Sequence, residues 1–178
     1  MGLGEFGKRS NSMSVHVLNI SQDHWINCSS GPVDTARHSG HSGPWTALKE
    51  EEGNPEYIIS EEDILIARRT SSNSDGTTGR DKHGVCGIWQ PNETAPVEDN
   101  TNHPFNKSYS WYLYCDAIET GTTVRYDENW DRLELPYQTL TGKSIYTLSS
   151  EEQRAYLDEL ITRSTFSQET KNWLDEKR

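Results

Sequence analysis

Residues 63–89 read DILIARRTSSNSDGTTGRDKHGVCGIW, two short apolar runs on either side of a polar loop. Runs of this kind around Ser, Asn, Asp, Gly and Thr are typical of a β-hairpin. The first run, Ile64–Ala67, is too short for a helix and alternates poorly, so we expect a strand buried on both faces. The two glycines around Val85 indicate that another backbone or a ligand approaches the returning strand closely. We place this hairpin at the centre of a small β-barrel.

Length and composition point to one globular unit. The chain has 178 residues, 31% of them hydrophobic, and its six Trp and eight Tyr enlarge the core that it can form. No apolar run approaches the roughly 18 residues that a membrane-spanning helix needs, and no signal peptide is visible. We therefore expect a cytoplasmic protein that does not bind membranes. Residues 1–13 are expected to be a tag or disordered leader, 14–163 the domain, and 164–178 a helical extension.

The cysteine spacing and the net charge argue against several classes of protein. The three cysteines are widely spaced and form no CxxC pair, so neither a disulfide scaffold nor a zinc site is expected. The net charge is −11 at pH 7. Because phosphate neutralisation requires Lys and Arg, this charge argues against binding nucleic acid through bulk charge alone. The net charge does not exclude a local basic face on the protein.

The other segments before residue 140 predict further strands. Residues 15–20 and 24–27 are short and β-prone, and the run YSWYLYCDAI at 109–118 is the most strand-like in the chain. Another strand is expected at 122–126.

The C-terminal part has the pattern of helices. The capping box Ser149-x-x-Glu152 precedes apolar residues at helical spacing, and Thr165-x-x-Gln168 resembles a second box. Helices are therefore predicted at about 149–163 and 166–176. Together with the strands, they indicate an α+β fold.

Catalytic motifs are absent from the sequence. It contains no GxSxG, P-loop or HExxH, and no GxGxxG before a helix. His38 and His41 share a Gly/Ser loop, but solvent-exposed histidines explain them better than metal ligands do. No metal or cofactor is expected. An enzyme on nucleic acid or a nucleotide, with Asp63, Asp99 or His83 in acid–base roles, is the weaker hypothesis.

Four tryptophans lie at the edges of predicted strands or just past a Gly-rich turn: Trp25, Trp45, Trp89 and Trp111. Aromatic rings at such edges can hold a flat ligand, and a base stacked on one gains ~1–3 kcal/mol. Taken singly, each ring is better explained as a core residue, whereas the pattern of four favours a binding slot. A slot of this kind could also take a peptide, which makes a protein-interaction module a third hypothesis.

Six segments follow one another along the chain: HWINCS (24–29), GPWTAL (43–48), SEEDILIARR (60–69), HGVCGIW (83–89), the aromatic run ending at residue 118, and LTGKSIYTLSSEE (140–152). In order and spacing they resemble an EVE domain of the PUA-like superfamily, which also contains the YTH and ASCH domains. The resemblance implies a PUA-like mixed β-barrel with flanking helices. It also implies a binding module that takes a modified base out of the stack and into a pocket.

The resemblance implies two sets of site residues. Aromatic rings and polar groups for the base pocket are supplied by Trp25, Asn27, Ser29, Ser30, Trp45, Thr46, Trp89 and Trp111. Phosphates would contact the basic residues at the two ends of the central loop, Arg68, Arg69, Arg80 and Lys82. The alternative for this basic cluster is a solvated loop. The expected partner is DNA or RNA with a modified, methylated base, and a nuclease or NTPase subunit of a modification-dependent restriction system could be a second partner.

Overall fold

The computed structural model describes residues 13–30, 43–49, 59–92, 97–98, 109–121, 125–126 and 144–178. The strands are β1 (Val15–Ile20), β2 (Trp45–Lys49), β3 (Ile64–Arg69), β4 (Gly84–Pro91), β5 (Val97–Glu98), β6 (Tyr109–Thr120) and β7 (Ile145–Thr147). The helices are α1 (Trp25–Ser30), α3 (Ser150–Arg163) and α4 (Gln168–Lys177). Within these ranges no helix is both long and apolar enough to cross a membrane.

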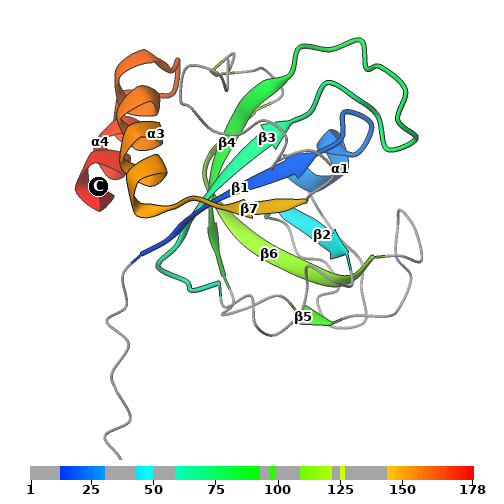
Figure 1. The fold of residues 1–178 in the computed structure, drawn as a ribbon, viewed down its shortest axis with the longest axis horizontal. Helices are drawn as coiled ribbons and strands as arrows, with labels where there is room; N and C mark the ends of the chain where they lie inside the picture. The colour runs from blue at the N-terminus through cyan, green and yellow to red at the C-terminus, as the bar shows by residue number, and fades with distance from the viewer. Residues whose placement is uncertain are drawn as a thin grey trace, which may run out of the picture.

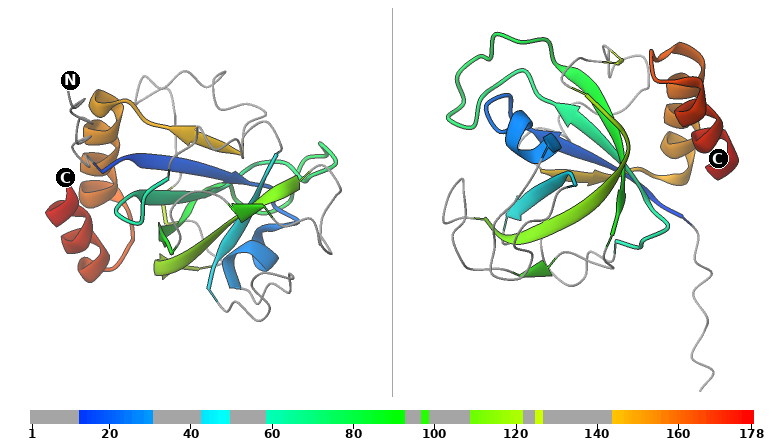
Figure 2. Two further views of the ribbon diagram at one scale, coloured as in Figure 1. Left: turned by 90° about the horizontal axis from the view of Figure 1, so that it is seen from below. Right: turned by 180° about the vertical axis from the view of Figure 1, so that it is seen from behind.

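The strands form one seven-stranded mixed sheet in the order β2-β6-β4-β3-β1-β7, with β5 paired to β6. β1 and β3 run parallel, and the other neighbours are antiparallel. The sheet curls into a half-barrel, with α3 and α4 at one side and α1 at the other (Figures 1 and 2). The expected α+β fold with a barrel-like sheet is therefore confirmed.

The central hairpin has the predicted form. β3 pairs with β4 in a register that sets Ile66 opposite Ile88, and β1 covers the other edge of β3. All six residues of β3 are buried. This confirms the expectation of a strand buried on both faces, because one face meets the C-terminal helices and the other meets the barrel interior.

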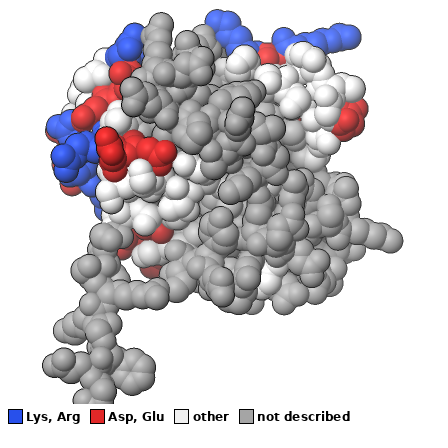
Figure 3. Space-filling model, viewed as in Figure 1, with Lys and Arg blue, Asp and Glu red and all other residues white. Residues whose placement is uncertain are grey.

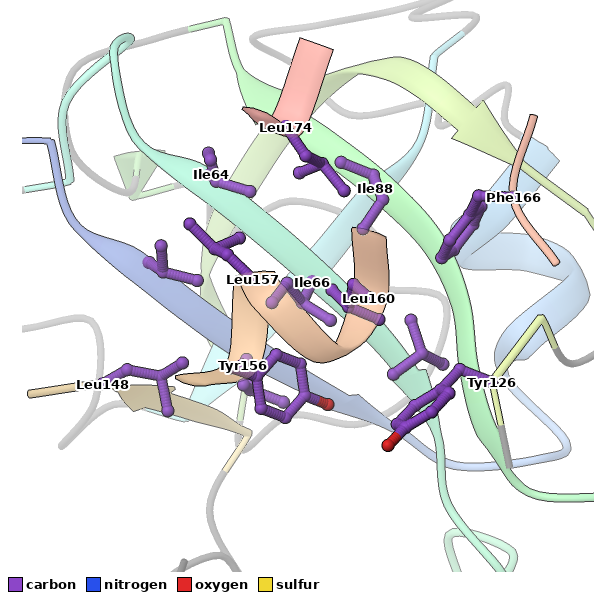
Figure 4. Close-up of a cluster of buried hydrophobic side chains, with 13 residues drawn as sticks. Ile64, Ile66, Ile88, Tyr126, Leu148, Tyr156, Leu157, Leu160, Phe166 and Leu174 are labelled. Carbon is purple, nitrogen blue, oxygen red and sulfur yellow. The ribbon is translucent and has the colours of Figure 1, made fainter. Parts of the chain in front are cut away.

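Two hydrophobic clusters lie on the two faces of the sheet, because side chains alternate along a strand. The outer cluster joins Val15, Ile64 and Ile66 to Leu157 and Leu160 of α3 (Figure 4). It also contains Phe166 and Leu174, so α4 shares this core with the sheet. The inner cluster fills the barrel with Leu18, Ile20, Trp25, Cys28, Leu48, Ile59, Leu65, Ala67, Cys86, Trp89, Leu113, Cys115 and Ile145.

Residues 24–27, predicted as a strand, form the end of a turn and the start of a helix. α1 begins at Trp25, directly after a turn in which the His24 N–H donates to Ser21 O at 3.1 Å. Helical spacing places Trp25, Cys28 and Ser29 on the buried face and leaves Ile26 exposed. The strand prediction was wrong because the short apolar run carries the i, i+3, i+4 pattern of a one-sided helix.

The two C-terminal helices begin as follows. Ser149 and Glu152 form the predicted capping box, with Ser149 N–H donating to Glu152 Oε2 at 2.7 Å. The prediction of a second capping box at Thr165 and Gln168 is wrong. The N-cap of α4 is Ser167, whose hydroxyl accepts from Thr170 N–H at 3.2 Å. Thr165 is engaged elsewhere, since its N–H and its hydroxyl both donate to Arg125 O.

The strand expected at 122–126 lies mostly outside the described residues. At its end, Tyr126 forms an isolated antiparallel bridge with Val85. Val85 N–H donates to Tyr126 O at 3.1 Å.

Candidate nucleic-acid interface

The loop between β3 and β4, residues 70–83, is fastened to the turn that precedes α1. The Gln22 side chain pairs with the backbone of Asp81 in both directions: its Nε2 donates to Asp81 O at 2.5 Å, and its Oε1 accepts from Asp81 N–H at 3.0 Å. Asp23 accepts from the N–H of Ser74 at 2.9 Å and from its hydroxyl at 2.5 Å. The loop is therefore held in place on α1's side of the molecule.

Two glycines adapt the loop to this arrangement. A Cβ on Gly79 would lie 1.8 Å from Gln22 Oε1, so only glycine leaves room for the Gln22 side chain. Gly76 has a φ of +84°, in the left-handed region that glycine adopts without strain. The loop also contains a bridge between Ser72 and Thr78. Its shape is thus set before any ligand arrives, which lowers the ordering cost of binding.

The predicted phosphate-binding residues divide into two pairs. Arg80 and Lys82 are exposed on the loop, where Figure 3 shows Lys and Arg atoms at the edge of the molecule. Arg68 and Arg69 are each only 8% exposed. Arg69 Nε donates to Lys82 O at 2.9 Å, and Arg68 donates to Asn19 Oδ1 at 3.3 Å. The buried pair supports the stem of the loop, and the exposed pair adds positive charge to its surface.

The four predicted tryptophans do not lie on one surface. Trp25 and Trp89 stack inside the barrel, with ring centroids 5.8 Å apart and an interplanar angle of 18°. Trp111 packs against the same inner cluster and is partly exposed. Trp45 lies on the opposite face of β2, stacked on Tyr112 at 5.8 Å. Three of the rings therefore belong together, and Trp45 belongs to a separate aromatic cluster with Ala47, Tyr112 and Tyr114.

The polar residues predicted for the pocket also separate. Thr46 is buried on β2, and its strand partner is Leu113 of the inner cluster. Ser29 is buried on α1 and donates to Ile26 O at 3.5 Å, whereas Asn27 on the same helix is exposed. Ser30 ends α1, and its side chain lies outside the described residues.

No protein-family model matches this chain, and no curated protein matches it. The geometry of the residues is therefore the ground on which a function can be assigned.

Asp63, the first residue proposed for acid–base chemistry, is a structural clamp. Its carboxylate accepts from the N–H groups of Ser14 and Ser60, each at 2.8 Å, and lies 3.1 Å from His16 Nε2. The other ring nitrogen of His16 is 2.8 Å from Thr147 Oγ1. Burial alone would raise the pKa of Asp63, but hydrogen bonds from His16 and the two backbone N–H groups hold it below its usual range. The clamp joins β1, β7 and the start of β3.

Of the other residues proposed for acid–base or metal chemistry, the structure describes only His83, which is exposed at the end of the loop. Asp99, His38 and His41 lie outside the described residues. Among the residues that the structure describes, no group of three His, Cys, Asp or Glu side chains could hold a metal ion. Cys28, Cys86 and Cys115 are buried and form no disulfide, and burial raises the pKa of the Cys28 and Cys115 thiols.

Sequence reasoning missed Gln22 and Asp23, the side chains that anchor the loop. Gln22 meets Asp81 across 59 positions of the chain. The sequence does contain a signal for these two residues. Gln22 and Asp23 are a polar pair shortly before Trp25, and they would have predicted a turn if the segment from Trp25 had been interpreted as a helix.

Proposed function

We propose that this protein is a PUA-like, EVE-type module that binds a nucleic acid carrying a methylated or otherwise modified base, with the base flipped out of the stack. The observation that carries the proposal is the link between charge and aromatic rings. Arg80 and Lys82 flank Asp81, Asp81 pairs with Gln22, and Gln22 stands three residues before Trp25 of the inner stack. A phosphate on the loop would thus hold its nucleotide close to the aromatic interior.

The curled mixed sheet and its hairpin support the PUA-like assignment. A flipped base loses its stacking and pairing, at a cost of a few kcal/mol, and the pocket must offset that loss. Stacking on an aromatic ring returns ~1–3 kcal/mol per base. Trp111 is the partly exposed ring of the inner set, so we assign it the first contact with the base.

The function would be that of a specificity module in a modification-dependent restriction system, with a nuclease or NTPase subunit as its partner. The module itself needs no catalytic residue, which agrees with a structural role for Asp63. Because the net charge of the chain is −11, attraction for phosphate depends on local groups of cations, such as the exposed Arg80 and Lys82 of the loop.

The decisive measurement is a binding panel at several salt concentrations. Oligonucleotides that differ only in one base would carry cytosine, 5-methylcytosine, 5-hydroxymethylcytosine, adenine or N6-methyladenine, as DNA and as RNA. We expect one modified base to bind at least about tenfold tighter than its unmodified parent, a difference of about 1.4 kcal/mol. Equal affinity across the panel at low salt would contradict the proposal.

Two variants test the contribution of the loop cations separately from that of the Trp111 ring. Replacing both Arg80 and Lys82 by Ala should weaken all oligonucleotides equally and lower the salt slope by about 1–2, since each phosphate contact contributes about 0.7–0.9. Arg154→Ala, an exposed residue of α3, is the charge control.

Trp111→Ala should instead remove the preference for the modified base. Trp173→Ala is its control, because Trp173 of α4 is also partly buried but packs on the outer cluster. A preference that survives the Trp111 change and disappears with Trp173→Ala would show that the inner set is not the pocket.

A further inference from the structure

Three side chains form a hydrogen-bonded chain at one end of the sheet: Thr147 of β7, His16 of β1 and Asp63 at the start of β3. Thr147 Oγ1 lies 2.8 Å from His16 Nδ1, and His16 Nε2 lies 3.1 Å from Asp63 Oδ2. His16 and Asp63 are each 3% exposed, whereas Thr147 is exposed. A buried imidazole therefore lies behind a hydroxyl group that solvent can reach.

The register of the sheet brings the hydroxyl and the imidazole together. His16 and Thr147 are direct partners in the β1–β7 ladder, so their side chains lie on the same face. Asp63 directly precedes β3, whereas the loop 70–83 follows the other end of that strand. The six residues of β3 span about 20 Å, so this group of residues is separate from the candidate nucleic-acid interface.

The ionised carboxylate of Asp63 determines the tautomer of His16. Burial opposes ionisation of Asp63, but hydrogen bonds from His16, Ser60 and Ser14 hold its pKa below the usual range. A carboxylate can only accept hydrogen bonds, so His16 Nε2 carries the proton and donates it to Asp63. In the neutral ring, Nδ1 is then the acceptor, and the Thr147 hydroxyl donates to it.

A hydroxyl, a base and an orienting carboxylate in this order are the arrangement that activates a nucleophile for covalent chemistry. We propose that Thr147 is a nucleophile that accepts an acyl group, with His16 as its general base and Asp63 as the residue that positions the ring. This activity goes beyond nucleic-acid binding and does not depend on it.

The acyl transfer is complete with these groups and an activated acyl donor. Thr147 Oγ1 attacks the carbonyl carbon of the donor while its proton moves to His16 Nδ1. The new ester bond forms, the bond to the leaving group breaks, and the departing thiolate or phenolate takes the electron pair and then the proton from Nδ1.

The surroundings of the hydroxyl select the class of donor. The N–H groups of Ser14 and Ser60 are engaged by Asp63 and are not available to stabilise an oxyanion. The donor must therefore bring a good leaving group of its own, as a thioester or an aryl ester does. Amides and alkyl esters lack such a leaving group and should not react.

Acylation by para-nitrophenyl acetate tests the proposal. The full chain would be incubated with this ester and digested, and each acetyl adduct would be located by mass spectrometry. Treatment with alkaline hydroxylamine distinguishes threonine esters, which it cleaves, from lysine amides, which it leaves intact. Thr162 is the matched control hydroxyl, because it is exposed on α3 and donates to Asp158 O within its own helix.

We expect Thr147 to be acetylated at least about 100-fold faster than Thr162, because a positioned general base contributes about that factor or more. His16→Gln should remove this advantage. Thr147→Val should abolish the adduct, and Thr147→Ser should react faster because a primary hydroxyl is less hindered. In urea, the wild-type chain should acetylate both threonines equally, since the base is then no longer beside the hydroxyl.

Nitrogen NMR of the His16 ring provides a second measurement, which needs no variant. The wild-type spectrum should show a protonated Nε2 and an unprotonated Nδ1. In Asp63→Asn the ring should lose this fixed tautomer, because an amide can also donate to Nε2, and acetylation of Thr147 should slow with it.

Three results would overturn the proposal. One is acetylation of Thr147 no faster than that of Thr162. Another is a fast adduct at Thr147 that persists in His16→Gln. The third is a wild-type ring with its proton on Nδ1, since His16 would then donate to the Thr147 hydroxyl and only support the structural clamp.

Discussion

An added methyl group at Gly79, in the β3–β4 loop, would displace a neighbouring side chain. Its Cβ would lie 1.8 Å from Gln22 Oε1, so the Gln22 side chain would have to leave Asp81. We expect Gly79→Ala to destabilise the protein by about 1–3 kcal/mol. Faster amide exchange of Asp81 should accompany the fall in melting temperature, since Gln22 protects that N–H.

Gly76→Ala is the matched control for this change. Gly76 has a φ of +84° but nothing within 4 Å of its Cβ position, so only backbone strain of about 1–2 kcal/mol applies. Asp81 exchange should stay as in the wild type. Equal exchange at Asp81 in both variants would show that Gln22 does not anchor the loop.

Asp63 makes the stability of the fold depend on pH in a defined direction. Burial opposes ionisation of Asp63, but its hydrogen bonds from His16, Ser60 and Ser14 outweigh burial and lower the folded-state pKa. The stabilisation is therefore fully present above the ordinary pKa of about 3.9, and is lost as the pH falls through the lower folded-state value.

Asp63→Asn should remove this dependence. One side-chain oxygen cannot accept from both backbone N–H groups as the carboxylate does, so we expect a loss of about 1–3 kcal/mol at neutral pH. Melting curves from pH 2 to pH 7 should converge with those of the wild type in acid. Asp116→Asn, at an exposed position of β6, should follow the wild type throughout. A constant gap between Asp63→Asn and wild type would contradict the clamp.

At the scale of elements, α3 depends on its first turn. Ser149 and Glu152 satisfy each other's backbone N–H groups at the end of the helix that covers the outer face of the sheet. Ser149→Ala should cost about 0.5–2 kcal/mol, and Ser149→Asp should recover most of it, because Asp is an equally good N-cap. Denaturant unfolding measures both. If Asp and Ala destabilise equally, the cap does not control this helix.

For the whole molecule, the outer cluster joins both C-terminal helices to the sheet. Leu174 of α4 is 0% exposed in this cluster, so Leu174→Ala should cost about 2–5 kcal/mol and shift one cooperative unfolding transition. Glu176→Ala, an exposed change two positions away, should have little effect. A separate, earlier transition for the helices would show instead that α4 unfolds independently of the sheet.

Local patterns in the sequence were sufficient for several parts of this fold. The hairpin of β3 and β4, the long strand β6 and the capping box at Ser149 all depend on neighbouring residues, through alternation, turn composition and backbone capping. The same patterns placed four tryptophans near strand ends. They could not assign a face to each ring, because a bulge or a one-residue shift reverses the side on which a side chain lies.

Only the tertiary structure decided which of these residues act together. Trp25 of α1 and Trp89 of β4 stack because both side chains enter the same inner cluster. Trp45 does not join them, because its side chain belongs to a separate aromatic cluster on the other face of β2. Arg68 and Arg69 are withdrawn from solvent by neighbouring strands that a linear pattern does not reveal. The sequence by itself determined the hairpin and its basic loop; the anchoring of that loop by Gln22 needed a partner 59 residues away, and contacts of that range form only when the chain is folded.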